Sequence, residues 1–190
     1  MKRPFIVVVD TLCCLLIFFM LTVPTPKTPK RIDTLGLYAV VATWPNGSND
    51  DVDLYLRDPA GTVCFFRAQS AGLMHLEQDD LGTGTTNTYT LPSGKVVRFT
   101  QNQERILVQG IVAGEYVVNV HMYEKRDRGP IPVTVQLWEL RGENRVVITR
   151  VVTLSSAGQV DTPFRFTLTA GGDVSSTSTV PLDVVNAGNS

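Results

Sequence analysis

The stretch that decides the fold spans residues 116–123 and reads YVVNVHMY. From Val118 onward, apolar and polar side chains alternate along it. Residues 132–138 (PVTVQLW) alternate in the same way. A period of two places one face of a strand against a core and the other toward solvent. Both stretches therefore predict half-buried β-strands.

Segments of the same character fill residues 35–168 around this pair. They are rich in Val, Ile, Thr, Tyr and Phe, and turn-forming Gly, Pro, Asn and Asp separate them. The predicted strands are 35–44, 52–57, 62–67, 95–100, 105–111, 116–123, 131–140, 145–154 and 164–169. About 135 residues of short strands are enough to build a hydrophobic core. The pattern predicts an all-β domain over residues 35–170, folded as one antiparallel β-sandwich.

Two segments of different composition flank this domain. Residues 171–190 (GGDVSSTSTVPLDVVNAGNS) are rich in Ser, Thr and Gly, with few apolar anchors. Such a composition predicts a disordered tail. Residues 24–34 begin PTPKTPKR, and closely spaced prolines favour an extended, stiff spacer. We expect residues 24–34 to be a Pro-rich linker. An ordinary connector without a spacer role is equally compatible with this sequence.

Residues 5–23 (FIVVVDTLCCLLIFFMLTV) form a run of 19 residues, 16 of them apolar. A helix of about 20 such residues spans a bilayer. Asp10 raises the free energy of inserting such a helix into the membrane by about 2.5–3.5 kcal/mol, and each Leu, Ile, Phe or Val lowers it by about 0.3–0.6 kcal/mol. The run holds 13 of those four types, so insertion remains favourable. A single N-terminal transmembrane helix is predicted at residues 5–23.

Two other interpretations of this run are open. Lys2 and Arg3 could begin a cleaved signal peptide, but the run ends in VPTPKTPK without a small-x-small cleavage site. A plain membrane anchor with an incidental Asp10 is the other. Intramembrane carboxyls are rare and usually functional, which favours a working Asp10. On a helix, Thr11, Cys13 and Cys14 lie close to Asp10, where small side chains suit close packing of a second helix.

From Asp10 the sequence DTLCCLLIFFMLTVP resembles the transmembrane helix of the ExbD and TolR family, and more distantly that of MotB. The matching positions are Asp10, Leu15, Leu16, Phe19, Met20 and Pro24. The resemblance implies an inner-membrane, stator-type motor subunit with residues 1–4 in the cytoplasm and the sandwich in the periplasm. It implies a homodimer inside a ring of ExbB-, TolQ- or MotA-like multi-span subunits.

By the same resemblance, Asp10 is the proton-carrying residue and protons are the coupling ion. Desolvation disfavours the charged form of a buried carboxyl, so such a group can take up and release a proton near neutral pH. The envelope target of the sandwich is not indicated. The alternative function is a membrane-tethered β-sandwich binding module without proton transport.

The sandwich carries a second resemblance, in DVDLYLRDPAGTVCFF (residues 51–66), DDLGTG (79–84) and AGEYVVNVHMYEKRDRGPIPVTVQLWE (113–139). These stretches are similar to an uncharacterised bacterial β-sandwich family and to prepeptidase C-terminal domains found beside secreted proteases. The resemblance implies a non-catalytic module.

Acidic residues gather at two places in this domain. Asp51 and Asp53 belong to one group, and Asp79 and Asp80 to the other. Carboxylate oxygens are the ligands that Ca²⁺ prefers, so the four predict a calcium site if the two segments meet. The alternative is that these residues cap turns with their own side chains.

Other function classes find little support in the sequence. No nucleophile elbow, phosphate loop or zinc-hydrolase motif is present, and the only histidines are His75 and His121. We therefore expect no enzyme activity and no cofactor beyond protons and the calcium considered above. A net charge of −1 leaves no basic stripe for phosphates, so nucleic acid is not an expected partner.

Overall fold

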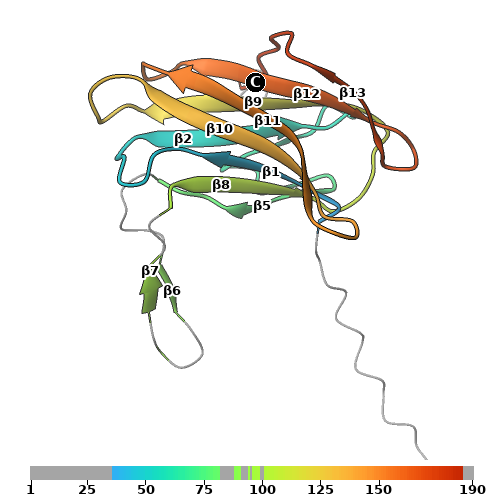
Figure 1. Ribbon diagram of the computed structural model, residues 1–190, viewed down its shortest axis with the longest axis horizontal. Coiled ribbons are helices and arrows are strands. Elements are labelled where there is room, and N and C mark those ends of the chain that lie inside the picture. The colour runs from blue at the N-terminus through green and yellow to red at the C-terminus, as the bar shows by residue number, and fades with distance from the viewer. Residues whose placement is uncertain (1–35, 82–87, 91–93, 95, 99–100, 186–190) are drawn as a thin grey trace, which may run out of the picture. The chain divides into compact units, whose positions relative to one another are not determined.

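The structure, a computed structural model, describes residues 36–81, 88–90, 94, 96–98 and 101–185 (Figure 1). All of them belong to one compact unit. The predicted transmembrane helix at residues 5–23 and the linker at 24–34 lie outside the described residues. Within the described part, no helix has the length and apolar character that a bilayer crossing requires.

Thirteen strands make up the described chain. They are β1 (Tyr38–Thr43), β2 (Asp51–Arg57), β3 (Val63–Cys64), β4 (Ser70–Ala71), β5 (Met74–Gln78), β6 (Thr88–Thr90), β7 (Val96–Arg98), β8 (Gln103–Val108), β9 (Gly114–Glu124), β10 (Ile131–Glu139), β11 (Arg145–Leu154), β12 (Val160–Leu168) and β13 (Val174–Ser178).

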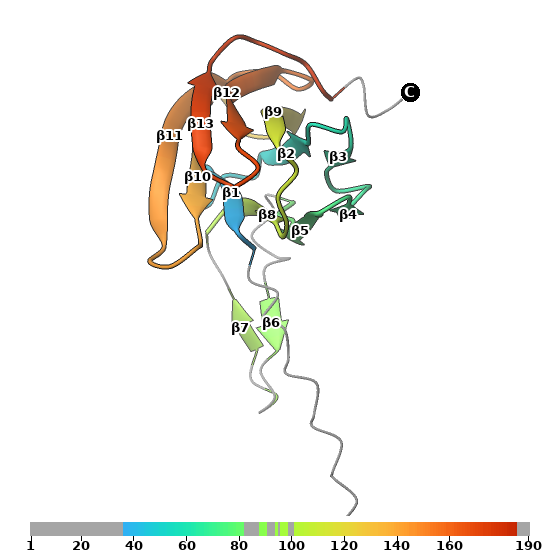
Figure 2. The same cartoon turned by 90° about the vertical axis from the view of Figure 1, so that its right-hand side faces the viewer.

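The strands form two antiparallel sheets and a separate two-stranded pair, β6 with β7. Sheet A has the order β11-β10-β1-β8-β5-β4, and sheet B has the order β13-β12-β9-β2-β3. The two sheets lie face to face as two layers (Figure 1). At one side of the sandwich, β3 and β4 close the gap between the layers (Figure 2). The antiparallel β-sandwich predicted from the sequence is thereby confirmed.

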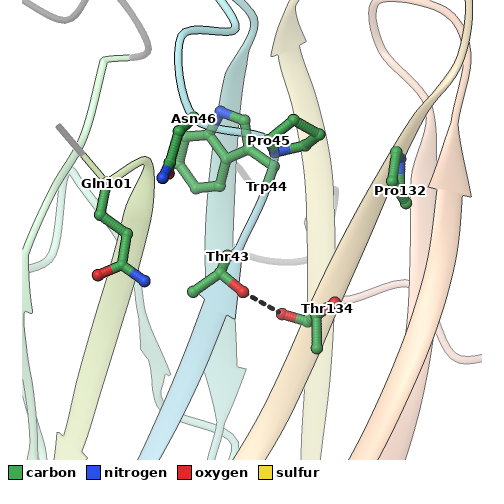
Figure 3. A pocket seen from close by; sticks show the side chains of 7 residues that line it. All are labelled: Thr43, Trp44, Pro45, Asn46, Gln101, Pro132 and Thr134. Carbon is green, nitrogen blue, oxygen red and sulfur yellow. Dashed lines mark hydrogen bonds between the residues drawn. The ribbon is translucent and has the colours of Figure 1, made fainter.

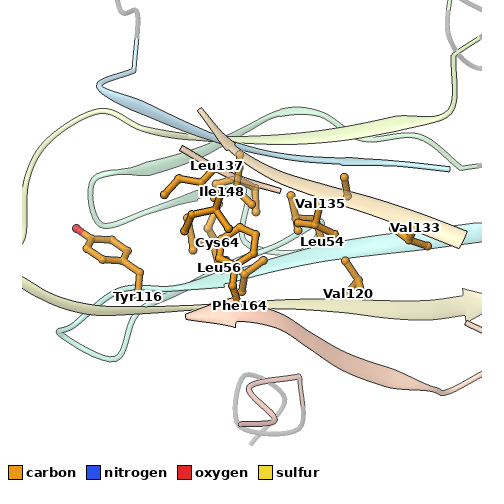
Figure 4. Packing of buried hydrophobic residues seen from close by; sticks show 14 of the residues in the cluster. Leu54, Leu56, Cys64, Tyr116, Val120, Val133, Val135, Leu137, Ile148 and Phe164 are labelled. Carbon is orange, nitrogen blue, oxygen red and sulfur yellow. The ribbon is translucent and has the colours of Figure 1, made fainter. Parts of the chain in front are cut away.

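The core lies between the inner faces of the two sheets. In β10, Val133, Val135 and Leu137 point inward and are fully buried, as the alternation predicts. Phe164 in β12 and Leu54 in β2 meet them from sheet B (Figure 4). One continuous apolar cluster spans both layers, so the sandwich forms a single packed body.

The C-terminal boundary differs from the prediction of a disordered tail beginning at residue 171. Residues 174–178 form β13, which pairs with β12, and Val184 and Val185 are buried against Tyr55 in β2. Composition did not predict β13, because its Ser and Thr residues are ordered by main-chain pairing with β12 and not by their side chains. The sandwich therefore extends to residue 185.

The sequence also did not predict the short strands β4 and β5, of which β4 is the outermost strand of sheet A. The segment 70–78 lacks a run of β-branched residues, and a glycine, Gly72, interrupts it at φ +59°. β5 is held in strand conformation by its pairing with β8, and not by the local strand propensity of its residues.

Candidate functional site

Strand β2 carries two carboxylates into a buried position. Val52 and Leu54 point into the core, so Asp51 and Asp53 lie on the opposite face of the strand. That face is covered too, because the two residues are only 4% and 3% exposed. Burying a carboxylate is costly unless it is paired or hydrogen-bonded. The position of these two residues therefore calls for a physical explanation.

A third carboxyl approaches β2 from the other sheet. Glu104 is in phase with Ile106 and Val108 on β8, so it points between the sheets and is 1% exposed. Its Oε2 atom accepts a 2.6 Å hydrogen bond from the Leu54 amide. That amide faces the side of β2 that the short strand β3 does not cover. Glu104 thus bridges sheet A and sheet B.

Asp79 supplies the fourth carboxyl, directly after the end of β5. Its carboxyl group lies within hydrogen-bonding reach of Glu104, and it acts electrostatically on Asp51 and Asp53. We call Asp51, Asp53, Asp79 and Glu104 the carboxyl corner. Its members come from β2, from the end of β5 and from the start of β8, which the fold brings together where the two sheets approach.

The corner strongly disfavours negative charge. Burial, followed by the charge of Asp53, raises the pKa of Asp51 to about 7. Burial also raises the pKa of Asp53, against the opposing effect of His121. Burial and the charge of Asp53 raise the pKa of Glu104 well above its ordinary value. These carboxyls need a positive partner, or a proton, to remain in place.

The partners that the described residues provide are few. His121 in β9 is opposite Asp53 in the strand register, and its Nδ1 lies 3.5 Å from Asp53 Oδ2, which is an ion-pair distance rather than a good hydrogen bond. One oxygen of each corner residue is buried without a hydrogen-bond partner. These atoms are Asp51 Oδ1, Asp53 Oδ2, Asp79 Oδ1 and Glu104 Oε1.

The structure brings three of the four predicted calcium ligands into the corner. The fourth, Asp80, uses its Oδ2 to accept a 3.1 Å hydrogen bond from the Gln103 amide. Within the described ranges, no three His, Cys, Asp or Glu side chains are already spaced to hold one metal ion. Sequence reasoning missed Glu104, although its in-phase position ahead of Ile106 and Val108 was a readable signal.

Turn capping accounts for other acidic residues near the corner. Asp50 accepts hydrogen bonds from the amides of Arg126 and Asp127 and pairs with Lys125 at 2.7 Å. Asp127 in turn accepts from the Asn49 amide. Lys125 and Arg126 are therefore engaged by the loop that precedes β2.

A separate open pocket of about 330 Å³ lies at one end of sheet A (Figure 3). Its lining combines an indole, two prolines, two threonines and two amides, from Thr43, Trp44, Pro45, Asn46, Gln101, Pro132 and Thr134. The Thr43 hydroxyl donates a 3.4 Å hydrogen bond to the Thr134 carbonyl, which braces its floor. Such a lining suits a polar ligand with an apolar face.

The proton-carrying residue predicted from the sequence, Asp10, and its neighbours Thr11, Cys13 and Cys14 lie outside the described residues. No protein-family model, curated protein or solved structure matched the chain in three comparisons. Any functional assignment therefore has to come from the residues themselves.

Proposed function

We propose that the chain is an ExbD-, TolR- or MotB-like subunit of an inner-membrane proton-channel motor. In this proposal, proton flow through Asp10 drives movement of the periplasmic sandwich. The observation that carries it is one carboxyl within an apolar run of membrane length, followed in register by Leu15, Leu16 and Phe19. Protonation would remove the charge of Asp10. The helix would then prefer a different surface of the surrounding ring.

The sandwich is suited to transmit the movement that such a motor generates. Its two sheets share one core, and Glu104 and Tyr38 add hydrogen bonds from one sheet to the other. A closely packed body resists deformation and can pass on a displacement applied at one end. The proposed partners are a second copy of the chain, a ring of ExbB-, TolQ- or MotA-like subunits, and an envelope component that binds the sandwich.

A second candidate is a membrane-tethered binding module without proton transport. The pocket at Trp44, Asn46 and Gln101 favours it, because a binding module needs a ligand site and a motor strut does not. Both functions use the sandwich at the membrane surface, so the role of Asp10 separates them.

The experiment compares Asp10→Asn, Asp10→Glu and wild type. Each chain is expressed with an ExbB-, TolQ- or MotA-like multi-span subunit, and proton uptake into right-side-out membrane vesicles is followed with a pH-sensitive dye. We expect Asp10→Asn to abolish uptake and Asp10→Glu to retain part of it, at equal amounts of membrane-inserted protein. Asp33→Asn removes a carboxyl beyond the apolar run and serves as the matched control.

Uptake by Asp10→Asn at the wild-type rate would exclude the proton-carrier role. The tethered module would then be the better assignment. A neighbouring gene for a protein with three or more spans is the first genomic feature to look for.

A further inference from the structure

Residues 182–185 cover an apolar surface on the face of sheet B that points away from the core. Beyond β13 the chain passes over β12 and β9 on that side (Figure 2). Val184 and Val185 are buried there. They pack against three side chains that we call the outer patch, Tyr55, Phe65 and Val117. The segment thus completes a second apolar cluster in addition to the one between the sheets.

Two polar side chains, which we call the clasp, hold the main chain of this segment. Asn119 is fully buried; its Nδ2 donates to the Leu182 carbonyl at 3.0 Å, and its Oδ1 accepts from the Val184 amide at 2.7 Å. The Thr162 hydroxyl accepts a 3.1 Å hydrogen bond from the Leu182 amide. Among the described strands, none pairs with residues 182–185. The segment is therefore bound as an extended peptide is bound, through main-chain hydrogen bonds and apolar side chains.

The clasp and the outer patch require an occupant of this kind. Asn119 lies on β9 with its amide group buried, and a buried amide without hydrogen-bond partners is costly. Removal of the segment would also expose the aromatic and aliphatic side chains of the outer patch to water. These contacts depend on the main chain and the apolar side chains of the occupant. They do not require that the occupant belongs to the same copy of the chain.

The connector between β13 and the segment is held only loosely. Its three residues, Thr179, Val180 and Pro181, are all exposed. The Val180 amide donates a hydrogen bond to Ser178 Oγ, only two residues back. Release of residues 182–185 would therefore leave the pairing of β13 with β12 in place. Local opening of such a segment requires less free energy than unfolding of the whole sandwich.

We propose that two copies of the chain exchange this segment, so that residues 182–185 of one copy occupy the clasp and outer patch of the other. The second copy carries an identical segment, which would form the same hydrogen bonds and apolar contacts. Exchange of an identical element is a low-cost way to join two chains. The inference rests on the proposed function for the second copy alone. Paired membrane helices would hold the two sandwiches at a high local concentration, which favours exchange.

The experiment mixes two full-length variants in detergent micelles. Asn119→Ala breaks the clasp and keeps the segment, whereas Val184→Asp breaks the segment and keeps the clasp. Neither variant can exchange with itself. In the mixture, the intact segment of the first variant can enter the intact clasp of the second. We therefore expect part of the mixture to unfold at a higher temperature than either variant alone, as followed by tryptophan fluorescence.

A second measurement tests the wild-type chain. Two wild-type copies with different affinity tags should be recovered together, and Val184→Asp copies should lose part of that recovery. Val180→Asp is the matched control, because it makes the same change in the exposed connector and should behave as wild type. If the first two variants do not fold, Thr162→Val and Val184→Ser replace Asn119→Ala and Val184→Asp.

Two results would overturn the exchange. One is a mixture whose unfolding curve is the sum of the curves of its separate components. The other is equal recovery of tagged copies for wild type and Val184→Asp. Pairing of the membrane helices cannot imitate the expected rise on mixing, because both variants keep residues 5–23 unchanged. These measurements do not involve the charge of Asp10, so failure of the exchange would leave the proton-carrier proposal to its own test.

Discussion

The hydroxyl of Tyr38 donates a 2.7 Å hydrogen bond to the carbonyl of Gly172, 134 positions further along the chain. Tyr38 begins β1 in sheet A, and Gly172 lies in the turn between β12 and β13 of sheet B. Arg141 donates to the same hydroxyl at 3.0 Å and to the Gly171 carbonyl at 3.0 Å. These bonds tie the two sheets together at the end of the sandwich where β1 begins.

Tyr38→Phe should destabilise the sandwich by about 1–3 kcal/mol, because it leaves the buried Gly172 carbonyl without a donor. Tyr123→Phe is the control, since Tyr123 is 49% exposed. Urea unfolding of the full-length chain in detergent, followed by tryptophan fluorescence, measures both variants. Equal unfolding midpoints would mean that the Tyr38 bond contributes nothing.

The segment 182–185 should behave as part of the core. Val184 is fully buried, and its amide donates a 2.7 Å hydrogen bond to Asn119 Oδ1. Val184→Asp should therefore cost about 3 kcal/mol or more, because it buries an unpaired charge. Val180→Asp makes the same change at a position that is 61% exposed, and should stay within about 0.5 kcal/mol of wild type. Similar urea midpoints for the two variants would show that the segment does not pack on sheet B.

The fold could be predicted from the sequence wherever side chains alternate, and much less where pairing is set by distant partners. The alternation in β10 located its inner face correctly. β13 consists of Val, Ser and Thr residues whose order comes from β12, so nothing local marked it. The candidate site divides in the same way. Asp51, Asp53 and Asp79 were found as acidic groups, but their meeting with Glu104 depends on the approach of the two sheets.

Gly114 lies where β9 begins, and a side chain there would meet the turn between β2 and β3. Its φ is +130°, and an added Cβ would lie 2.7 Å from Cβ of Pro59. Gly114→Ala should therefore lose about 1–3 kcal/mol to the clash alone, in addition to backbone strain. Gly129→Ala isolates the strain, because Gly129 also has a positive φ but has no atom within 4 Å of an added Cβ. Thermal unfolding should rank Gly114→Ala below Gly129→Ala, and the reverse order would exclude close packing at Pro59.

Acid should weaken the sandwich through Asp50. Burial alone would raise the pKa of this carboxyl, but the Lys125 ammonium and the amides of Asp127 and Arg126 outweigh burial and hold the pKa below 3.8. A carboxyl whose pKa is lower in the folded state than in the unfolded state stabilises the fold at pH values above the unfolded-state pKa. That stability is lost as the pH falls below about 4.

Asp50→Asn should therefore reduce stability at pH 7 by about 1–3 kcal/mol, because it leaves the part-buried Lys125 ammonium with only the Asp127 carbonyl as a partner. The variant should also lose less stability than wild type between pH 4 and pH 2, since it no longer has a carboxylate to protonate at this position. Urea midpoints measured across this range test both statements, with Glu143→Gln in an exposed turn as the control for removing one charge. Parallel acid curves for Asp50→Asn and wild type would show that this ion pair does not set the acid limit of the fold.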